Sequence, residues 1–297
     1  MANIMEKKSA RILALILAFI MIGSILAYAF RGPSKPEERT IKFDMGNSLK
    51  DWLRYIPNST EYILYFNYST DNRSLLSFVY NATVSAMRYM DPYAFSLFEP
   101  RNIGMFKRML IGHPELYLVD LEKRKVYFAY EAKREYYGYN VKISKRIMGR
   151  YYAMTDDIHP IVYGYPDSVI GTLYIIANHG NGSIMDVYGN YTNRINGTFK
   201  YAIMVTGETA KSSIQSNGTP MADFYFEGYR MNGTMFEKVV GIHFIGNYFF
   251  VKSNKTEFYY CRNYDDGFSI AVMCDHNLTK LINTTPEIRS IVIKIGG

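Results

Sequence analysis

The side chains best suited to acid–base or metal chemistry in this sequence are histidines that stand beside carboxylates. His159 follows Asp156 and Asp157, and His276 follows Asp275. Such pairs have the ingredients of a general acid–base couple or of two metal ligands. Neighbouring residues on a strand point to opposite faces of a sheet, so residues this close in sequence rarely converge on one ligand. We therefore assign no catalytic, cofactor-binding or metal-binding residue from the sequence.

Motifs of the common reaction classes are absent from the sequence. It contains no GxSxG nucleophile elbow, no HExxH metal motif, no GxxxxGKS/T or GxGxxG phosphate loop, and no CxxC or CxxCH pair. We expect no cofactor, and a binding protein rather than an enzyme.

Asparagine-linked glycosylation is the modification that the sequence favours. Asn-x-Ser/Thr triplets occur twelve times, several times more often than this composition gives by chance. Asn-Gly pairs are also good turn sequences, but turns do not explain the triplets at Asn67 and Asn254, which lack the glycine. We exclude Asn217 because Pro220 follows its triplet. The predicted acceptors are Asn58, Asn67, Asn72, Asn81, Asn181, Asn190, Asn196, Asn232, Asn254, Asn277 and Asn283.

The acceptors are unevenly distributed, and none lies between residues 84 and 180. A glycan is bulky and polar, so a surface that contacts a partner should lack one. The gap predicts that residues 84 to 180 carry a contact face. A larger share of buried core in this segment would explain the gap equally well.

Basic residues gather inside this gap, among many tyrosines. Basic and aromatic groups together could bind an anionic partner, such as lipid head groups, an acidic polysaccharide or an acidic protein face. The alternative is an ordinary solvated hairpin and helix face. The candidate patch consists of Lys123, Arg124, Lys125, Lys133, Arg134, Lys142, Lys145, Arg146 and Arg150.

The amino-terminal region predicts export. Residues 12 to 30 carry no charge, and as a helix they would span about 28 Å, close to the ~30 Å hydrocarbon core of a bilayer. The basic tail, residues 1 to 11, favours a cytoplasmic amino terminus and places the rest of the chain outside. Ala27, Tyr28 and Ala29 offer the alternative of a cleaved signal peptide, which exports the chain as well. A proline-containing linker follows over residues 31 to 44.

The cysteines fit an exported protein but not a disulfide-rich scaffold, since only Cys261 and Cys274 are present. They flank an expected hairpin that turns at Asp266-Gly267. This register would place Cys261 opposite Val272 and Cys274 on the diagonal, roughly 7 Å away. A bridge would need a bulge or a longer loop. The exported location nevertheless favours a disulfide between them.

The spacing of apolar residues predicts both helices and strands. Hydrophobic residues make up 48% of the chain, enough for a folded core rather than a disordered stalk. We expect helices over 48–56, 72–90 and 166–178, a strand over 61–68, and a hairpin over 115–132. Residues 181 to 199 are expected to form a glycosylated loop, and from residue 199 strands follow one another before a last helix and strand.

This order of elements indicates an α+β fold, with a single transmembrane helix followed by an ectodomain of mainly antiparallel sheets and a few packed helices. We divide the ectodomain into an α+β half, residues 45 to 180, and a β-rich half, residues 181 to 297.

Many acceptor triplets, few cysteines and one amino-terminal anchor together resemble archaeal surface proteins in composition. We expect a membrane-anchored, N-glycosylated cell-surface protein, held in the lipid bilayer by residues 12–30, that binds or scaffolds a protein partner through its glycan-free face. The alternative is an extracytoplasmic hydrolase whose site is assembled from dispersed Asp, Glu and His. Nucleic acid is disfavoured as a partner by the exported location and the lack of a recognised motif.

Overall fold

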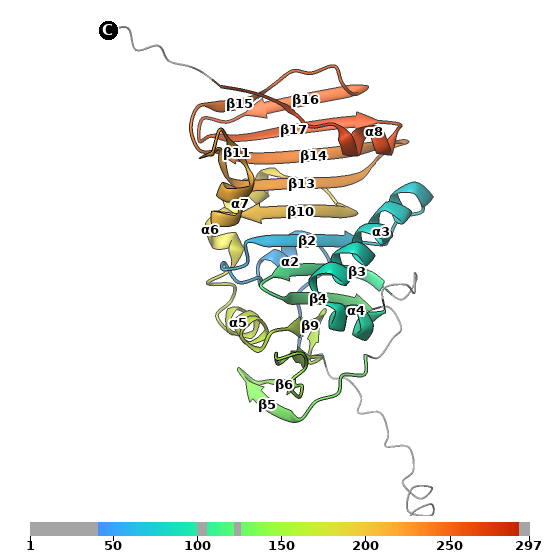
Figure 1. Cartoon of the computed structure of the whole chain (residues 1–297), viewed down its shortest axis with the longest axis vertical. Coiled ribbons are helices and arrows are strands. Elements are labelled where there is room, and N and C mark those ends of the chain that lie inside the picture. The colour runs from blue at the N-terminus through green and yellow to red at the C-terminus, as the bar shows by residue number, and fades with distance from the viewer. Residues whose placement is uncertain (1–40, 100–105, 122–125, 291–297) are drawn as a thin grey trace, which may run out of the picture. The chain divides into compact units, whose positions relative to one another are not determined.

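A twelve-stranded sheet forms the centre of the computed structural model, which describes residues 41–99, 106–121 and 126–290 (Figure 1). Its strand order is β16-β17-β14-β13-β10-β2-β3-β4-β9-β7-β6-β5, and every neighbouring pair is antiparallel. The strands are β2 (Tyr62–Asn67), β3 (Phe106–His113), β4 (Leu116–Leu121), β5 (Ala132–Tyr136), β6 (Tyr139–Ile143), β7 (Ala153–Thr155), β9 (Ile161–Gly164), β10 (Tyr201–Thr206), β13 (Ala222–Asn232), β14 (Met235–Phe244), β16 (Phe258–Asn263) and β17 (Phe268–Asp275).

Three smaller pairs of strands flank this sheet. The first is parallel and joins β1 (Phe43–Asp44) to β8 (Ile158–His159). The other two are antiparallel. They join β11 (Gln215–Ser216) to β12 (Thr219–Pro220), and β15 (Tyr248–Val251) to β18 (Glu287–Ser290).

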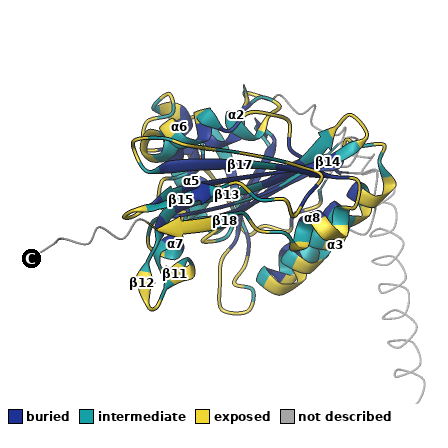
Figure 2. Cartoon of the chain, turned by 90° about the horizontal axis from the view of Figure 1, so that it is seen from above, coloured by how far each residue is buried: buried dark blue, intermediate teal, exposed yellow. Residues whose placement is uncertain are grey.

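Helices pack on both faces of the sheet, as the view in Figure 2 shows. One face carries α2 (Leu49–Leu53), α5 (Pro166–Ala177) and α6 (Ile184–Arg194), whose apolar side chains share one core. The other carries α3 (Arg73–Met90), α4 (Pro92–Phe98) and α8 (Leu278–Asn283) over two further clusters. Helix α7 (Gly207–Ser213) directly follows β10.

Strand β2 shows why its sequence favours this central position. Ile63 and Tyr65 pack into the core on the α2 face, whereas Leu64 and Phe66 pack into the core on the α3 face. Alternate residues of a strand point to opposite sides, so a run of apolar residues suits a strand covered on both faces.

The apolar stripe and the N-cap residue of its sequence explain why α3 forms a helix. The side chain of Asn72 accepts a hydrogen bond from the backbone nitrogen of Leu75 at 3.0 Å, which satisfies one of the free donors at the helix start. Val79 and Met87 continue the buried stripe at helical spacing. The helix expected over residues 72–90 is therefore confirmed.

The fold is mixed α+β with mostly antiparallel sheets and a few helices, as expected. We divided the ectodomain into residues 45 to 180 and residues 181 to 297. In the structure, one sheet continues across this boundary, because β2 pairs with β10. The described residues from Ile41 onward form a single compact unit.

Two expected elements are wrong. The hairpin over 115–132 does not form: β4 pairs with β3 and β9, and β5 begins only at Ala132. The segment 181–199 is not an open loop, because residues 184–194 form α6. Ser183 and Asp186 begin this helix with a reciprocal capping box.

Within the three described ranges, no helix is both long enough and apolar enough to cross a membrane. The expected span at residues 12–30 and the basic tail at 1–11 lie outside the described residues. Of the expected linker, residues 41–44 are described, and Phe43 and Asp44 form β1 rather than extended stem.

Candidate functional site

The acceptor-free segment forms one end of the sheet, from β3 to the edge strand β5, together with α4 and α5 (Figure 1). We explained the lack of acceptors in this segment either by a contact face or by a larger share of buried core. The structure contains both kinds of region, since β3 and β4 are almost entirely buried whereas β5 is mostly exposed. Within residues 84–180, the surface available for the contact face that we predict therefore lies mainly at the β5 edge.

Four basic side chains at this edge are solvent-exposed and have no carboxylate within ion-pair distance among the described residues. Lys133 and Arg134 lie on β5, and Lys145 and Arg146 lie in the loop that follows β6. The Nε of Arg146 donates a hydrogen bond to the carbonyl of Gly149 at 2.9 Å, which fixes its stem but leaves its charge uncompensated.

The other predicted patch residues are partly neutralised or lie elsewhere. Lys142 forms an ion pair with Asp156 at 3.0 Å. Arg150 pairs with Glu115 at 3.3 Å and lies over the ring of Tyr165, 5.4 Å from its centroid. The remaining three, Lys123, Arg124 and Lys125, are outside the described residues.

Exposed aromatic and apolar side chains lie close in sequence to these bases. Tyr127 is 88% exposed and Met148 is 87% exposed, while Tyr130, Tyr137 and Tyr151 are each about half exposed. Large apolar groups left in water at a charged edge are typical of an interaction site. We call the β5-edge surface the set Tyr127, Tyr130, Lys133, Arg134, Tyr137, Lys145, Arg146, Met148 and Tyr151.

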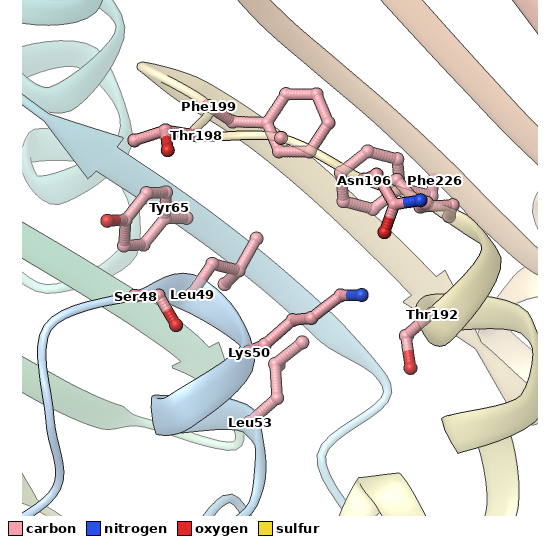
Figure 3. Close-up of a pocket in the computed structure, with 12 residues that line it drawn as sticks. Ser48, Leu49, Lys50, Leu53, Tyr65, Thr192, Asn196, Thr198, Phe199 and Phe226 are labelled. Carbon is pink, nitrogen blue, oxygen red and sulfur yellow. The ribbon is translucent and has the colours of Figure 1, made fainter.

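A pocket of about 330 Å³ lies beside α2 (Figure 3). Leu49 and Leu53 of α2 form one wall, and the loop before β10 forms the other. Lys50 reaches across toward the end of α6, where its Nζ donates to the carbonyl of Asn193 at 3.4 Å. Burial, followed by the nearby charge of Arg54, lowers the pKa of Lys50. The pocket could hold a small ligand with an apolar body and an anionic group.

A chain of charged groups links side chains of β3, β4, β8 and β1, and we call it the open charge cluster. The Nε of Arg108 donates to Asp120 at 2.9 Å, and Nε2 of His159 lies 3.1 Å from the same carboxylate. Nδ1 of His159 lies 3.2 Å from Asp44, whose side chain is 59% exposed. Arg108 also donates to the side chain of Asn47.

Electrostatics in the open charge cluster favour the charged forms. The hydrogen bond to Asp120, and less strongly the one to Asp44, raises the pKa of His159 despite its partial burial. Burial acts to raise the pKa of Asp120, but hydrogen bonds from His159 and Arg108 bring the pKa below its usual value. The arrangement is therefore a stable ion network rather than a histidine poised as a neutral base.

A second network, the closed charge cluster, lies in the other half of the sheet. Nζ of the fully buried Lys238 is 3.2 Å from Glu227 and donates to the carbonyl of Thr284 at 3.0 Å. The hydroxyl groups of Tyr225 and Tyr229 donate to the same carboxylate at 2.5 and 2.6 Å.

The histidines do not pair with the carboxylates beside them in the sequence, as we expected. Asp156 pairs with Lys142 and Asp157 with Lys42, so neither contacts His159. Its true partners, Asp44 and Asp120, are distant in sequence, and nothing local marks them. Likewise Nδ1 of His276 lies 2.9 Å from Glu257, not from Asp275. Over the described part of the chain, no cluster of three His, Cys, Asp or Glu residues could hold a metal ion.

Most predicted acceptor asparagines lie at the surface. Asn72 is half-buried because it caps α3, and Asn67 is an exception that corrects our prediction. Only 5% of Asn67 is exposed, and its amide nitrogen donates to the carbonyl of Phe199 at 3.4 Å. A buried amide cannot carry a glycan without opening the fold. The exposed acceptors are Asn58, Asn81, Asn181, Asn190, Asn196, Asn232, Asn254, Asn277 and Asn283.

The predicted disulfide is wrong: Cys261 and Cys274 are both free. The hairpin register differs by one residue from the expected one, because Cys261 pairs with Ala271 and not with Val272. A slip of one residue moves a side chain to the other face, so the two thiols point to opposite sides of the sheet. Burial, followed by the charge of Glu237, raises the pKa of Cys274 to about 11.

Comparisons with known proteins identify relatives. Residues 44–177 match the model of the AF_2048_N family N-terminal domain. An uncharacterized protein of Archaeoglobus fulgidus is 34% identical over 304 aligned positions, which cover 97% of this chain and 95% of that protein. The solved structure of crystal form I of TP0453 covers 77% of this chain and 95% of its own, with a TM-score of 0.35 and 9% identity. That similarity is too distant to support an inference.

Proposed function

The chain belongs to the same family as the Archaeoglobus fulgidus protein, and we propose that it is a membrane-anchored, N-glycosylated cell-surface protein that binds a partner through the β5-edge surface. In this proposal residues 12–30 cross the membrane once, with the amino terminus in the cytoplasm and the chain from residue 31 onward outside.

The observation that carries this proposal is the composition of the β5-edge surface. Four exposed bases without an ion-pair partner among the described residues, together with tyrosines and a methionine that are at least half exposed, lie within the segment that lacks acceptors. Exposed groups of both kinds in one place are costly unless a partner uses them. The acceptors elsewhere are mostly at the surface, where an oligosaccharide can be attached without disturbing the core.

The alternative of a hydrolase has less support. Such an enzyme needs carboxylates and imidazoles that converge on a concave pocket. The pocket beside α2 is lined by apolar groups, hydroxyl groups, an amide and Lys50, without Asp, Glu or His. His159 lies between two carboxylates that hold it in an ion network.

Mass spectrometry of intact glycopeptides from the native membrane tests the proposal. We expect sugar on most of the exposed acceptors and none on Asn67, which is an internal control because it has the triplet but is buried. Exchanging Asn81 for Gln should remove one glycan and leave the others. If no acceptor carries a glycan, the triplets serve only as turn-forming sequences and the proposal is wrong.

A further inference from the structure

We propose that the β5-edge surface binds the anionic head groups of the bilayer in which this chain is anchored; this inference rests on the proposed function. The partner is thus a lipid surface, and the binding would hold the sheet with its β5 end toward the membrane. Three features support it: where the first described residues lie, how many residues the linker has in the sequence, and which groups are exposed at the β5 edge.

The first described residues lie at the β5–β6 hairpin. Nζ of Lys42 donates to the carbonyl of Gly138, in the turn of this hairpin, at 2.7 Å. The same ammonium is 3.0 Å from the carboxylate of Asp157. Phe43 then pairs with Ile158 in the short parallel sheet. The point where the linker meets the folded unit is therefore fixed beside the β5-edge surface.

The linker is too short to let this point move far from the membrane. Ten residues, 31 to 40, separate the apolar segment from Ile41, and a fully extended chain of that length reaches at most about 36 Å. In the sheet, β5 and β16 are the two outermost strands. With strands about 4.8 Å apart, the β16 edge lies on the order of 50 Å from the β5 edge. An anchor at residues 12–30 would therefore limit how far Ile41, beside the β5 edge, can move from the bilayer, whereas the β16 edge lies farther from this attachment point.

The exposed groups have the chemistry that a lipid head-group layer requires. A lysine or arginine near an anionic membrane surface is attracted to it, and tyrosines favour the boundary between water and hydrocarbon. Lys133, Arg134, Lys145 and Arg146 supply the charge. Glu131 and Glu135 are exposed on the same edge and reduce it, so the net attraction is smaller than four independent bases would give.

The arrangement of these bases fits a diffuse layer of charge better than a single protein site. They lie on an edge strand and in a loop, on long flexible side chains, rather than converging on one pocket. Such groups can each find a phosphate without a defined geometry. The attraction should therefore weaken as salt screens it.

Amide hydrogen exchange on the full chain, reconstituted in lipid nanodiscs, tests this proposal. One set of nanodiscs contains only phosphatidylcholine, and in the other about a third of the lipid is phosphatidylglycerol. We expect the amides of residues 133–151 to exchange at least about threefold more slowly in the anionic nanodiscs. High salt should remove the difference.

Charge reversal provides the matched variants. The variant K133E/R134E/K145E/R146E should lose the protection, whereas K252E/K255E/R262E/R289E, which reverses four exposed bases near the β16 edge, should keep it. The double variant K145E/R146E changes only the loop and should lose part of the protection, which separates loss of binding from any disturbance of β5.

Three results would overturn the proposal. Equal exchange in neutral and anionic nanodiscs, with the chain incorporated in both, would exclude head-group binding but leave the membrane anchor intact. Protection that appears only in native membranes would mean that a protein covers this surface. A chain that does not enter nanodiscs at all would overturn the anchor and this inference together.

Discussion

The two buried charge clusters differ in how they meet the solvent. In the open charge cluster, the ions run from buried Arg108 and Asp120 through His159 to Asp44, which is mostly exposed. In the closed charge cluster, Lys238 and Glu227 are surrounded by tyrosine hydroxyl groups and backbone carbonyls.

This difference predicts how each cluster responds to change. A buried charge that loses its counter-ion keeps its desolvation cost, so a closed network with a single counter-ion for each charge is intolerant of truncation. A network that reaches the surface has water and a second partner available, and it includes a group that titrates near neutral pH. The closed cluster should therefore matter most for stability, and the open cluster for how stability depends on pH.

The largest effect is expected for Lys238→Ala. It leaves Glu227 without its cation and frees the carbonyl of Thr284, so the free energy of unfolding should fall by about 3 to 5 kcal/mol. Urea denaturation followed by circular dichroism measures this. Lys238→Met combined with Glu227→Gln removes both charges and should cost clearly less. An equal loss for the two variants would show that packing, and not the unpaired charge, dominates.

A smaller loss is expected for Arg108→Ala, about 2 to 3 kcal/mol by the same measurement. Asp120 would lose the guanidinium but keep His159, which the open cluster supplies as a second partner. A loss as large as that of Lys238→Ala would contradict the distinction between the two clusters.

The pH dependence of stability distinguishes the clusters next. Because the pKa of His159 is raised in the folded chain, its protonated form adds stability that is fully present below the unfolded pKa of about 6.5 and disappears as pH rises through the folded pKa. The stability difference between wild type and His159→Gln should be about 1 kcal/mol near pH 5.5 and small at high pH.

His243→Gln is the matched control for this titration. Nδ1 of His243 has one carboxylate partner, Asp223 at 2.6 Å, and its Nε2 lies 3.0 Å from a backbone carbonyl. The hydrogen bond to Asp223 raises the pKa of His243 as well. Because His243 has one carboxylate partner instead of two, the stability difference between wild type and His243→Gln should change with pH in the same direction as for His159→Gln, but by less. A stability difference between wild type and His159→Gln that grows with rising pH would show that protonated His159 does not stabilise the fold.

Asp44→Asn should change stability least, by no more than about 0.5 kcal/mol, because this carboxylate is exposed and screened. It should nevertheless lower the pKa of His159 relative to wild type, since it removes one of two anionic partners. An NMR titration of the His159 ring measures this. An unchanged titration would show that Asp44 does not belong to the cluster.

Local patterns in the sequence predicted part of this structure. Runs of strand-forming residues separated by Gly or Asn were sufficient for β10 and for the strands from β13 to β17. The stripe of Leu75, Val79 and Met87 was sufficient for α3. Helix α6 was missed because its glycine and acceptor triplets suggested a loop. The capping box of Ser183 and Asp186 was present in the sequence and would have indicated it.

The charge clusters could not be predicted, because their members come from different strands. Arg108 meets Asp120 across β3 and β4, and His159 reaches them only once β9 has paired with β4. The cysteine register was also out of reach, since it depends on a turn one residue different from the expected Asp266-Gly267 pair. Exposure alone separates Asn67 from the other acceptors, and the triplet itself contains no information about exposure.

The pairing of β2 with β10 has a consequence for how this chain is made. Strand β3 follows β2 soon in sequence, but the residues that cover the other edge of β2 are synthesised far later, since Tyr62 pairs with Val205. Until then one edge of an apolar strand remains unpaired, which invites association with other chains. During synthesis, the first half of the chain must therefore be kept apart from its neighbours until residue 206 has emerged.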